Sequence, residues 1–265
     1  GDTMNGDALT EETILVSERQ GILTATFNRP GKKNALTHDM YSRLVELLRH
    51  ADATAGIRVL CLRGAENCFT SGNDLLDFMS NPPTDEESPV LQFLHGVIDF
   101  AKPLVAAVEG PAIGIGTTML LHCDLVYASE TAFFQTPFAR LALCPEAASS
   151  FLLPRIIGLE RAGELLLLGK SINAATAAHW GLLTEVFPEG VFDSRLEERL
   201  NALAALPPEA LRDTKALIRG PLAAEAHEAV RREAQRFAQR LASGEAAEAL
   251  QAFFEHRPPD FSRFE

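Results

Sequence analysis

The chain has 265 residues, enough to bury the core of one large domain or of a domain with an appendage. Its 24 basic and 36 acidic side chains give a net charge of −12. This balance argues against nucleic acid and anionic membranes as partners, although a few local cations can still hold an anionic ligand. No segment approaches the roughly 20 consecutive apolar residues of a membrane span.

The cysteines and the chain ends predict a cytoplasmic protein. Cys61, Cys68, Cys123 and Cys144 show no CxxC spacing, so we expect reduced thiols rather than disulfides. The acidic N-terminal segment does not resemble a signal peptide, and the final SRFE is not the peroxisomal tripeptide. Paired histidine or histidine–cysteine spacings are missing, so no metal site is expected.

The first part of the chain alternates strand and helix patterns, which predicts an α/β fold. Two β-rich runs over 13–19 and 22–28 flank Gln20-Gly21 and predict a hairpin. Thr37 can cap a helix that ends near residue 53, and a strand is predicted over 58–63. A polar loop over 81–89 then leads into a helix that ends near residue 100.

Two glycine-bearing turns each follow a predicted strand. The first lies in 67–75, and the second, over 110–116, follows a buried strand at 104–108 and precedes a helix predicted over 117–122. Glycine allows the backbone to approach a ligand closely, and the start of a helix presents free N–H groups. One N–H group from each turn can therefore form an oxyanion hole for a carbonyl oxygen.

Later segments change from mixed structure to helix alone. Helices are predicted over 160–168 and 173–180, a last strand over 183–187, and further helices over 196–206, 208–218, 222–241 and 246–256. The change at Leu206-Pro207-Pro208 predicts a core over 1–206 and a C-terminal helical region over 207–265.

Glu146 is the candidate proton-transfer group, because its neighbours in the sequence are apolar. A dinucleotide-binding turn is disfavoured, since Gly114-Ile115-Gly116 lacks the third glycine and has Met119 in its place. The sequence contains no G-x-S-x-G motif, which argues against a serine hydrolase. Nothing in the sequence places a base beside Cys144, which argues against a cysteine nucleophile. An oxyanion hole beside a carboxylate favours enolate chemistry on an acyl compound.

The chain resembles the crotonase (enoyl-CoA hydratase/isomerase) superfamily over essentially its whole length. The matching stretches, in order, are Asn28-Arg29-Pro30 with Asn34-Ala35-Leu36, residues 69–75, residues 102–110, residues 123–128 and Gly181-Leu182-Leu183. The resemblance implies a spiral of ββα turns with a C-terminal α-helical trimerisation region. It also implies an acyl-CoA thioester substrate, no separate cofactor, and a homotrimer or a dimer of trimers.

The resemblance further implies roles for individual residues. The thioester oxygen would accept hydrogen bonds from the backbone N–H groups of Asn73 and Ile115. Lys32 or Lys33, together with Arg257 or Arg263, would neutralise the phosphates of CoA. The other residues expected to contact the substrate are Ala35, Leu36, Ser71, Asp74, Leu75, Gly114 and Phe138.

Within the family, the positions of the acids distinguish the reactions. The two glutamates of the hydratases correspond here to Thr118 and Phe138, so the usual pair for water addition is missing. Glu146 matches instead the glutamate of the peroxisomal-type Δ3,Δ2-enoyl-CoA isomerases, which implies proton transfer from C2 to C4 in fatty-acid β-oxidation. A hydratase or another crotonase-type reaction, and a non-catalytic acyl-CoA binding protein, remain the alternatives.

Overall fold

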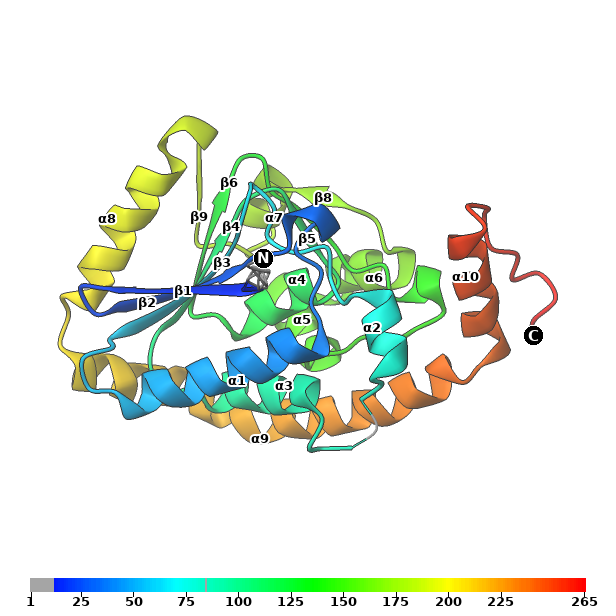
Figure 1. Cartoon of the computed structure of the whole chain (residues 1–265), viewed down its shortest axis with the longest axis horizontal. Helices are drawn as coiled ribbons and strands as arrows, with labels where there is room; N and C mark the ends of the chain where they lie inside the picture. The colour runs from blue at the N-terminus through cyan, green and yellow to red at the C-terminus, as the bar shows by residue number, and fades with distance from the viewer. Residues whose placement is uncertain (1–11, 84) are drawn as a thin grey trace, which may run out of the picture.

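The computed structural model describes residues 12–83 and 85–265 (Figure 1). The expectation about a signal peptide therefore lies outside the described residues. The main sheet has six strands in the order β1-β2-β3-β4-β6-β9. β1 (Ile14–Arg19) and β2 (Ile22–Phe27) form the predicted antiparallel hairpin. The remaining four strands run parallel to their neighbours: β3 (Val59–Gly64), β4 (Leu104–Val108), β6 (Leu125–Ser129) and β9 (Glu185–Phe187).

A second sheet has three strands, each of which comes directly before or after a strand of the main sheet along the chain. Its order is β5 (Pro111–Ile113), β7 (Phe133–Gln135) and β8 (Ile172–Asn173). β5 follows β4, β7 follows β6, and β8 precedes β9, so successive turns of the chain give one strand to each sheet. This is the spiral that the resemblance implies.

Helices cover both faces of the main sheet. On one face, α1 (His38–Ala53) and α3 (Pro89–Asp99) pack on each other and on the large core. On the other face, α8 (Phe192–Ala204) places Phe192, Leu196 and Leu200 against residues of β3 and β4. All five residues of β4 are buried, which explains why a continuous apolar run, rather than an alternating one, encodes this strand.

The helices not yet described that precede α8 each have ten residues or fewer in the described part of the chain. They are η1 (Pro30–Lys32), α2 (Leu75–Ser80), α4 (Ile115–Thr118), η2 (Met119–His122), η3 (Ala139–Leu141), α5 (Ser149–Ile157), α6 (Leu159–Leu168), α7 (Ala174–His179) and η4 (Glu189–Val191). The helix predicted over 117–122 therefore begins two residues earlier and tightens into a 3₁₀ turn. Helix α5, whose interior contains Pro154, is an element that was not expected from the sequence.

The C-terminal region contains one long helix where two were predicted. α9 (Pro208–Leu241) continues through Gly220 and Pro221, so the expected break at these residues is wrong. Proline removes one helical hydrogen bond, but contacts with the core fasten the helix just before it. The Lys215 ammonium donates to the Lys102 carbonyl at 2.7 Å, and the Arg219 guanidinium donates to the Leu121 carbonyl at 2.8 Å.

α9 runs beneath α1 and α3 and leads to α10 (Gly244–Phe254) at one edge of the molecule (Figure 1). Its residues Ala226, Ala229 and Val230 belong to the same core as the sheet and α1. The region after residue 207 is therefore packed into the main core as well as extending beyond it. None of the helices in the described part of the chain combines the length and apolarity needed to cross a bilayer.

Candidate active site

The two glycine-bearing turns lie side by side. Thr70 and Ala112 form a parallel bridge between them. The Thr70 N–H donates to the Pro111 carbonyl at 3.1 Å, and the Ile113 N–H donates to the Thr70 carbonyl at 3.0 Å. Gly72 has a φ of +100°, and a Cβ at this position would lie 3.1 Å from the Ile113 carbonyl oxygen. The turn therefore requires glycine both for its conformation and for its distance from the second turn.

Each turn presents one backbone N–H group that has no acceptor within the described residues. These are the N–H groups of Asn73 and Ile115, the two residues predicted for the oxyanion hole. Ile115 is the first residue of α4, where helix geometry leaves the N–H free. The preceding Gly114 has a φ of +59°, and this left-handed conformation turns the chain into the helix.

A cavity of about 570 Å³ brings the predicted residues together. Its lining includes Asn73, Ile115 and Glu146, together with Lys32, Lys33, Ala35, Ser71, Asp74, Leu75, Gly114 and Phe138. Leu36 is the exception: it is 1% exposed and does not line the cavity. Its N–H donates to the Gly72 carbonyl at 2.8 Å and its carbonyl accepts from Asp74, so Leu36 supports the first turn from behind.

Glu146 lies on the loop between η3 and α5, with its carboxyl group directed toward α4. The Thr118 hydroxyl donates a hydrogen bond to Glu146 Oε1. The residue retains some exposure because it lines the cavity. Its carboxyl group is nevertheless enclosed, and burial raises the pKa of Glu146 to about 8, with a smaller contribution from the negative charge of Glu233. A carboxyl group in this range can both accept and return a proton near neutral pH.

The other acid predicted in the cavity, Asp74, is occupied by structural contacts. Its side chain pairs with Arg29 at 3.1 Å and accepts the Asp77 N–H at 3.0 Å as the N-cap of α2. The backbone contact of Asp77 and the Arg29 guanidinium hold the pKa of Asp74 below its usual value. Asp74 therefore remains ionised and positions α2, and Glu146 is the carboxylate available for proton transfer.

Sequence reasoning missed the residue that orients Asn73. The Tyr41 hydroxyl donates a hydrogen bond to Asn73 Oδ1 from α1, 32 positions away. Tyr41 is buried on the core face of its helix, where it is indistinguishable in the sequence from an ordinary core residue. No local pattern could have identified this contact.

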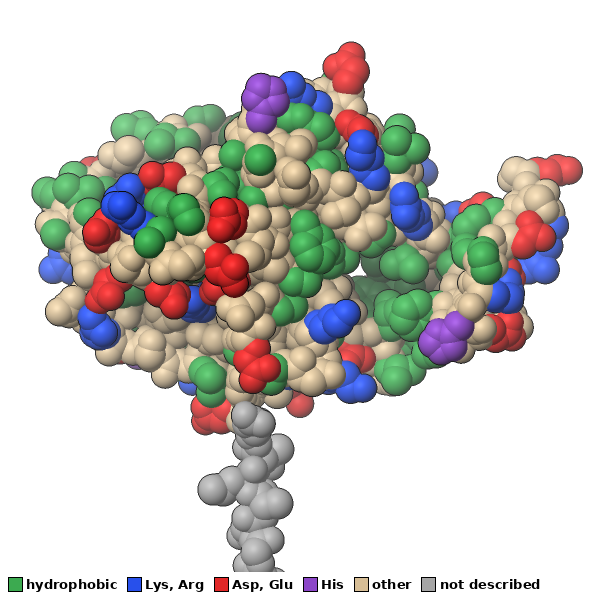
Figure 2. Space-filling view, turned by 90° about the horizontal axis from the view of Figure 1, so that it is seen from above, with side chains coloured by type: hydrophobic (Ala, Val, Ile, Leu, Met, Phe, Trp, Pro, Cys, Tyr) green, Lys and Arg blue, Asp and Glu red, His purple; other side chains and the backbone are tan. Residues whose placement is uncertain are grey.

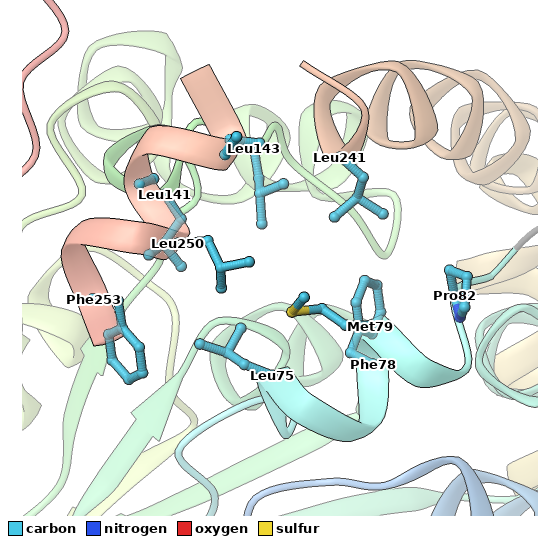
Figure 3. A pocket seen from close by; sticks show the side chains of 12 residues that line it. Leu75, Phe78, Met79, Pro82, Leu141, Leu143, Leu241, Leu250 and Phe253 are labelled. Carbon is cyan, nitrogen blue, oxygen red and sulfur yellow. The ribbon is translucent and has the colours of Figure 1, made fainter. Parts of the chain in front are cut away.

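Aromatic side chains from distant parts of the chain complete the cavity. Phe78 of α2, Phe237 of α9, and Phe253 and Phe254 of α10 line it. Beyond them lies a second, apolar chamber of about 360 Å³ between α2 and α10 (Figure 3). The two spaces share Leu75, Phe78, Leu141, Leu143 and Phe253. Figure 2 shows hydrophobic side chains gathered around the hollow between the main body and the projecting C-terminal segment.

Two lysines place positive charge at the cavity. Lys32 and Lys33 are exposed, and neither takes part in an ion pair within the described residues. The arginines suggested as further phosphate contacts lie elsewhere. Arg257 pairs with Glu248 at 2.6 Å and with Glu255 at 2.7 Å, and Arg263 lies 3.6 Å from Glu248; neither lines the cavity. Of these four basic residues, only Lys32 and Lys33 line the cavity, and their contact with phosphate stays a prediction.

The fold thus places two backbone N–H groups without acceptors and one enclosed carboxyl group in a single cavity. A family model described as enoyl-CoA hydratase/isomerase matches residues 17–263. The chain belongs to this family. A solved structure of an enoyl-CoA hydratase/isomerase from Pseudoalteromonas atlantica superposes with a TM-score of 0.90 and 40% identity, covering 95% of this chain and 100% of that one.

Curated relatives point to one branch of the family. The chain is 40% identical over 260 residues to enoyl-CoA delta isomerase 2 of Rattus norvegicus, which covers 96% of this chain and 66% of the rat protein. It is 42% identical over 215 residues to the Homo sapiens protein of the same name, covering 78% of this chain and 54% of the human protein. The chain thus spans little more than half to two thirds of the length of these relatives.

Proposed function

We propose that this protein is a Δ3,Δ2-enoyl-CoA isomerase, which moves the double bond of a 3-enoyl-CoA into conjugation with the thioester. The observation that carries the proposal is the position of Glu146: a carboxyl group of raised pKa lines the same cavity as two free backbone N–H groups. The identity to enoyl-CoA delta isomerases supports the same reaction.

In the proposed mechanism, the thioester carbonyl oxygen accepts hydrogen bonds from the N–H groups of Asn73 and Ile115. Both donors stabilise the negative charge that develops on this oxygen when the C2 proton leaves. The Glu146 carboxylate takes that proton, giving a dienolate. The protonated Glu146 then returns the proton to C4, and the electrons move to form the C2=C3 double bond. The carboxylate is regenerated, so no external acid, base or redox cofactor enters the balance.

The same cavity is poorly equipped for hydration. Adding water to a 2-enoyl-CoA requires one group to activate the water and another to place a proton on carbon. Thr118 and Phe138 stand where the family's hydratases carry glutamates, and neither side chain exchanges a proton at neutral pH. Glu146 alone can supply a base, which suffices for proton transfer but not for the usual two-acid hydration.

The remaining parts of the site suggest how the whole substrate is held. Lys32 and Lys33 are suited to the phosphates of CoA, because they are exposed cations at the cavity. The apolar chamber between α2 and α10 adjoins the catalytic cavity and shares five lining residues with it, and we assign the acyl tail to it. A homotrimer or dimer of trimers, a cytoplasmic location and a role in fatty-acid β-oxidation belong to the same proposal.

A direct comparison of two reactions tests the proposal. Purified protein is given 3-enoyl-CoA, and formation of the conjugated product is followed by ultraviolet absorbance; in parallel, 2-enoyl-CoA is supplied and hydration is followed by loss of that absorbance. We expect isomerisation to be much the faster reaction. Faster hydration would assign the chain to the hydratases. CoA-ester binding without turnover in either assay would indicate the non-catalytic alternative.

A further inference from the structure

The loop that carries Glu146 has an unfavourable backbone conformation. The two residues that follow, Ala147 and Ala148, have φ values of +57° and +60°. A left-handed conformation is disfavoured for any residue with a Cβ, and two in succession are unusual. Such a segment keeps its shape only when its surroundings hold it. The position of the Glu146 carboxyl group therefore depends on contacts made by its neighbours.

Glu233 of α9 makes the main contacts with this loop, although it lies more than 80 positions away in the sequence. Its Oε1 accepts the Ala148 N–H at 2.7 Å, and its Oε2 accepts the Ser150 N–H at 3.0 Å and the Ser150 hydroxyl at 2.5 Å. The residue is 6% exposed. Both carboxylate oxygens are thus used, and every contact goes to the residues immediately after Glu146-Ala147.

These contacts give α5 the cap that its own sequence lacks. The N-cap residue is Ala148, which has no side-chain oxygen to accept the free N–H groups of the first turn. Glu233 supplies that oxygen from another helix and adds a negative charge at the positive end of the α5 dipole. His122 Nε2 of η2 donates to the Ala147 carbonyl at 2.6 Å. The strained segment is thus held by contacts from both α9 and η2.

A carboxylate suits this position better than an amide. Three donors converge on two oxygens, and a carboxylate can accept from all of them because it carries no proton donor. A glutamine would direct its NH₂ group at one of these donors and leave it unpaired. Within the described residues Glu233 has no salt-bridge partner. The free-energy cost of burying its carboxylate is therefore offset by these N–H and O–H donors rather than by a cation.

We propose that Glu233 is a positioning residue for the isomerisation: its carboxylate fixes the Ala148–Ser150 backbone, and this in turn fixes the proton-transferring carboxyl group of Glu146. The proposal rests on the proposed function of Glu146. Glu233 and Glu146 also line one small hollow of about 40 Å³ together with Asn73 and Phe237. The negative charge of Glu233 therefore acts on Glu146 directly, and it contributes to the raised pKa of Glu146.

Other ionisable groups near the two carboxyl groups keep one protonation state around neutral pH. Burial raises the pKa of Tyr41 on α1 and of Cys144 on the loop, and lowers the pKa of His122 on η2 to about 4. Arg232, next to Glu233 on α9, places a positive charge near the Glu233 carboxyl group. Asp77 of α2 accepts the His38 N–H, and the Thr118 hydroxyl does not titrate. Between pH 6 and pH 9, changes in activity are thus expected to report the two glutamates.

The test compares Glu233→Gln with Glu228→Gln, which removes the same charge from an exposed position of the same helix. For Glu233→Gln we expect kcat to fall about tenfold to a hundredfold with KM nearly unchanged, since misplacing a catalytic group by about 1 Å costs this much. The inflection of kcat/KM with pH should move to lower pH, because the repulsion that raises the pKa of Glu146 is lost. Glu228→Gln should behave as wild type in both respects.

Two further measurements make the result decisive. Ser150→Ala removes one of the three donors and leaves the carboxylate, so it should lower kcat severalfold without raising KM, even if Glu233→Gln does not fold. The pKa of Glu146 can be followed by NMR of ¹³C-labelled glutamate, with the signal assigned from Glu146→Gln; this readout does not require turnover. A lowered pKa in Glu233→Gln would show that Glu233 acts on Glu146 even if wild-type protein failed to isomerise 3-enoyl-CoA, and the fall of kcat in Ser150→Ala, which keeps the charge, reports the positioning.

The proposal is overturned if folded Glu233→Gln keeps the wild-type kcat and pH profile. It is equally overturned if Glu233→Gln does not fold and Ser150→Ala matches wild type in kcat, KM and the pKa of Glu146. In either case, Glu233 only docks α9 against the core.

Discussion

The hydroxyl of Thr118 donates a hydrogen bond to the carboxyl group of Glu146. Position 118, where the family's hydratases are expected to carry an acid, thus contacts the acid that we propose transfers the proton in this chain. A glutamate at position 118 would direct a second carboxyl group at the first, and like charges at this distance repel. The proposed isomerase arrangement therefore has a physical basis: one carboxyl group has a neutral donor beside it.

This contact predicts a shift in pH dependence. The Thr118 hydrogen bond lowers the pKa of Glu146 and so opposes the effect of burial. Replacing Thr118 by the isosteric Val removes the donor, so the pKa should rise above its present value of about 8. Because the base form starts the reaction, kcat/KM should fall most at pH 7 and recover at higher pH. Thr118→Ser retains the hydroxyl and should keep the wild-type profile; an unchanged profile in Thr118→Val would remove this contact from the mechanism.

Glu146→Gln is expected to abolish most of the activity while preserving binding. The amide keeps the shape of the side chain but cannot accept the C2 proton, so kcat should fall by roughly 10²–10⁴ with little change in the affinity for CoA esters. Single-turnover absorbance and calorimetric titration measure the two effects. Glu228→Gln controls for the charge change. Wild-type isomerase rates in Glu146→Gln would move the chemistry to another residue.

The same substitution, Glu146→Gln, should change the stability of the fold by an amount that depends on pH. The pKa of Glu146 is higher in the folded protein than in the unfolded chain, so the native state binds the extra proton. The contribution to stability is present at low pH and is lost as pH rises toward and through about 8. Glu146→Gln should therefore gain in melting temperature relative to wild type as pH increases from 5 to 9. A constant difference across this range would show that the carboxyl group is not enclosed.

Removing Lys32 and Lys33 together should weaken CoA binding and reduce its dependence on salt. Both effects follow from the loss of exposed positive charge at the cavity, where attraction to phosphate is screened by ions. The measurement is a titration of CoA at two ionic strengths. Lys170→Ala offers a control, since this lysine pairs with Glu164 away from the cavity. Unchanged affinity and salt dependence would exclude the two lysines from phosphate recognition.

Filling the apolar chamber should change the preference for chain length. Leu250 of α10 and Met79 of α2 face each other across it (Figure 3). Leu250→Trp should lower kcat/KM for long-chain 3-enoyl-CoA while short-chain substrates are largely spared, because only a long tail needs the space. Leu217→Trp, at a 79% exposed position of α9, tests for general effects of the larger side chain. An equal loss for all chain lengths would place the tail elsewhere.

Much of the fold was predictable because local patterns encode it. The hairpin of β1 and β2, the capped helix α1 and the buried strand β4 all follow from residues near one another in the sequence. Thr37 accepts the Met40 N–H as the cap that its position predicts. The continuity of α9 was missed because Gly220-Pro221 is a local signal for a break, whereas the contacts that stabilise the helix come from distant segments.

The candidate site was predictable only in part. The residues of the turns and Glu146 were predicted because the motif order resembles a family, and eleven of the fourteen residues named as candidates line the cavity, with Leu36, Arg257 and Arg263 outside it. Leu36 was misplaced because its sequence neighbour Ala35 faces the cavity while its own side chain faces the core. Tyr41 and Glu233 could not be found at all, since their partners lie 32 and more than 80 positions away.

The contacts between α9 and the rest of the molecule limit where this chain can be divided or recombined with its relatives. Lys215 and Arg219 join one part of the helix to the core, and Glu233 joins another part to the loop of Glu146. The C-terminal segment is therefore not an interchangeable module. A chimera joined at Pro207 would keep a compatible catalytic loop only if the incoming helix supplied an acid at position 233, so residues 146–150 and 233 should be inherited together.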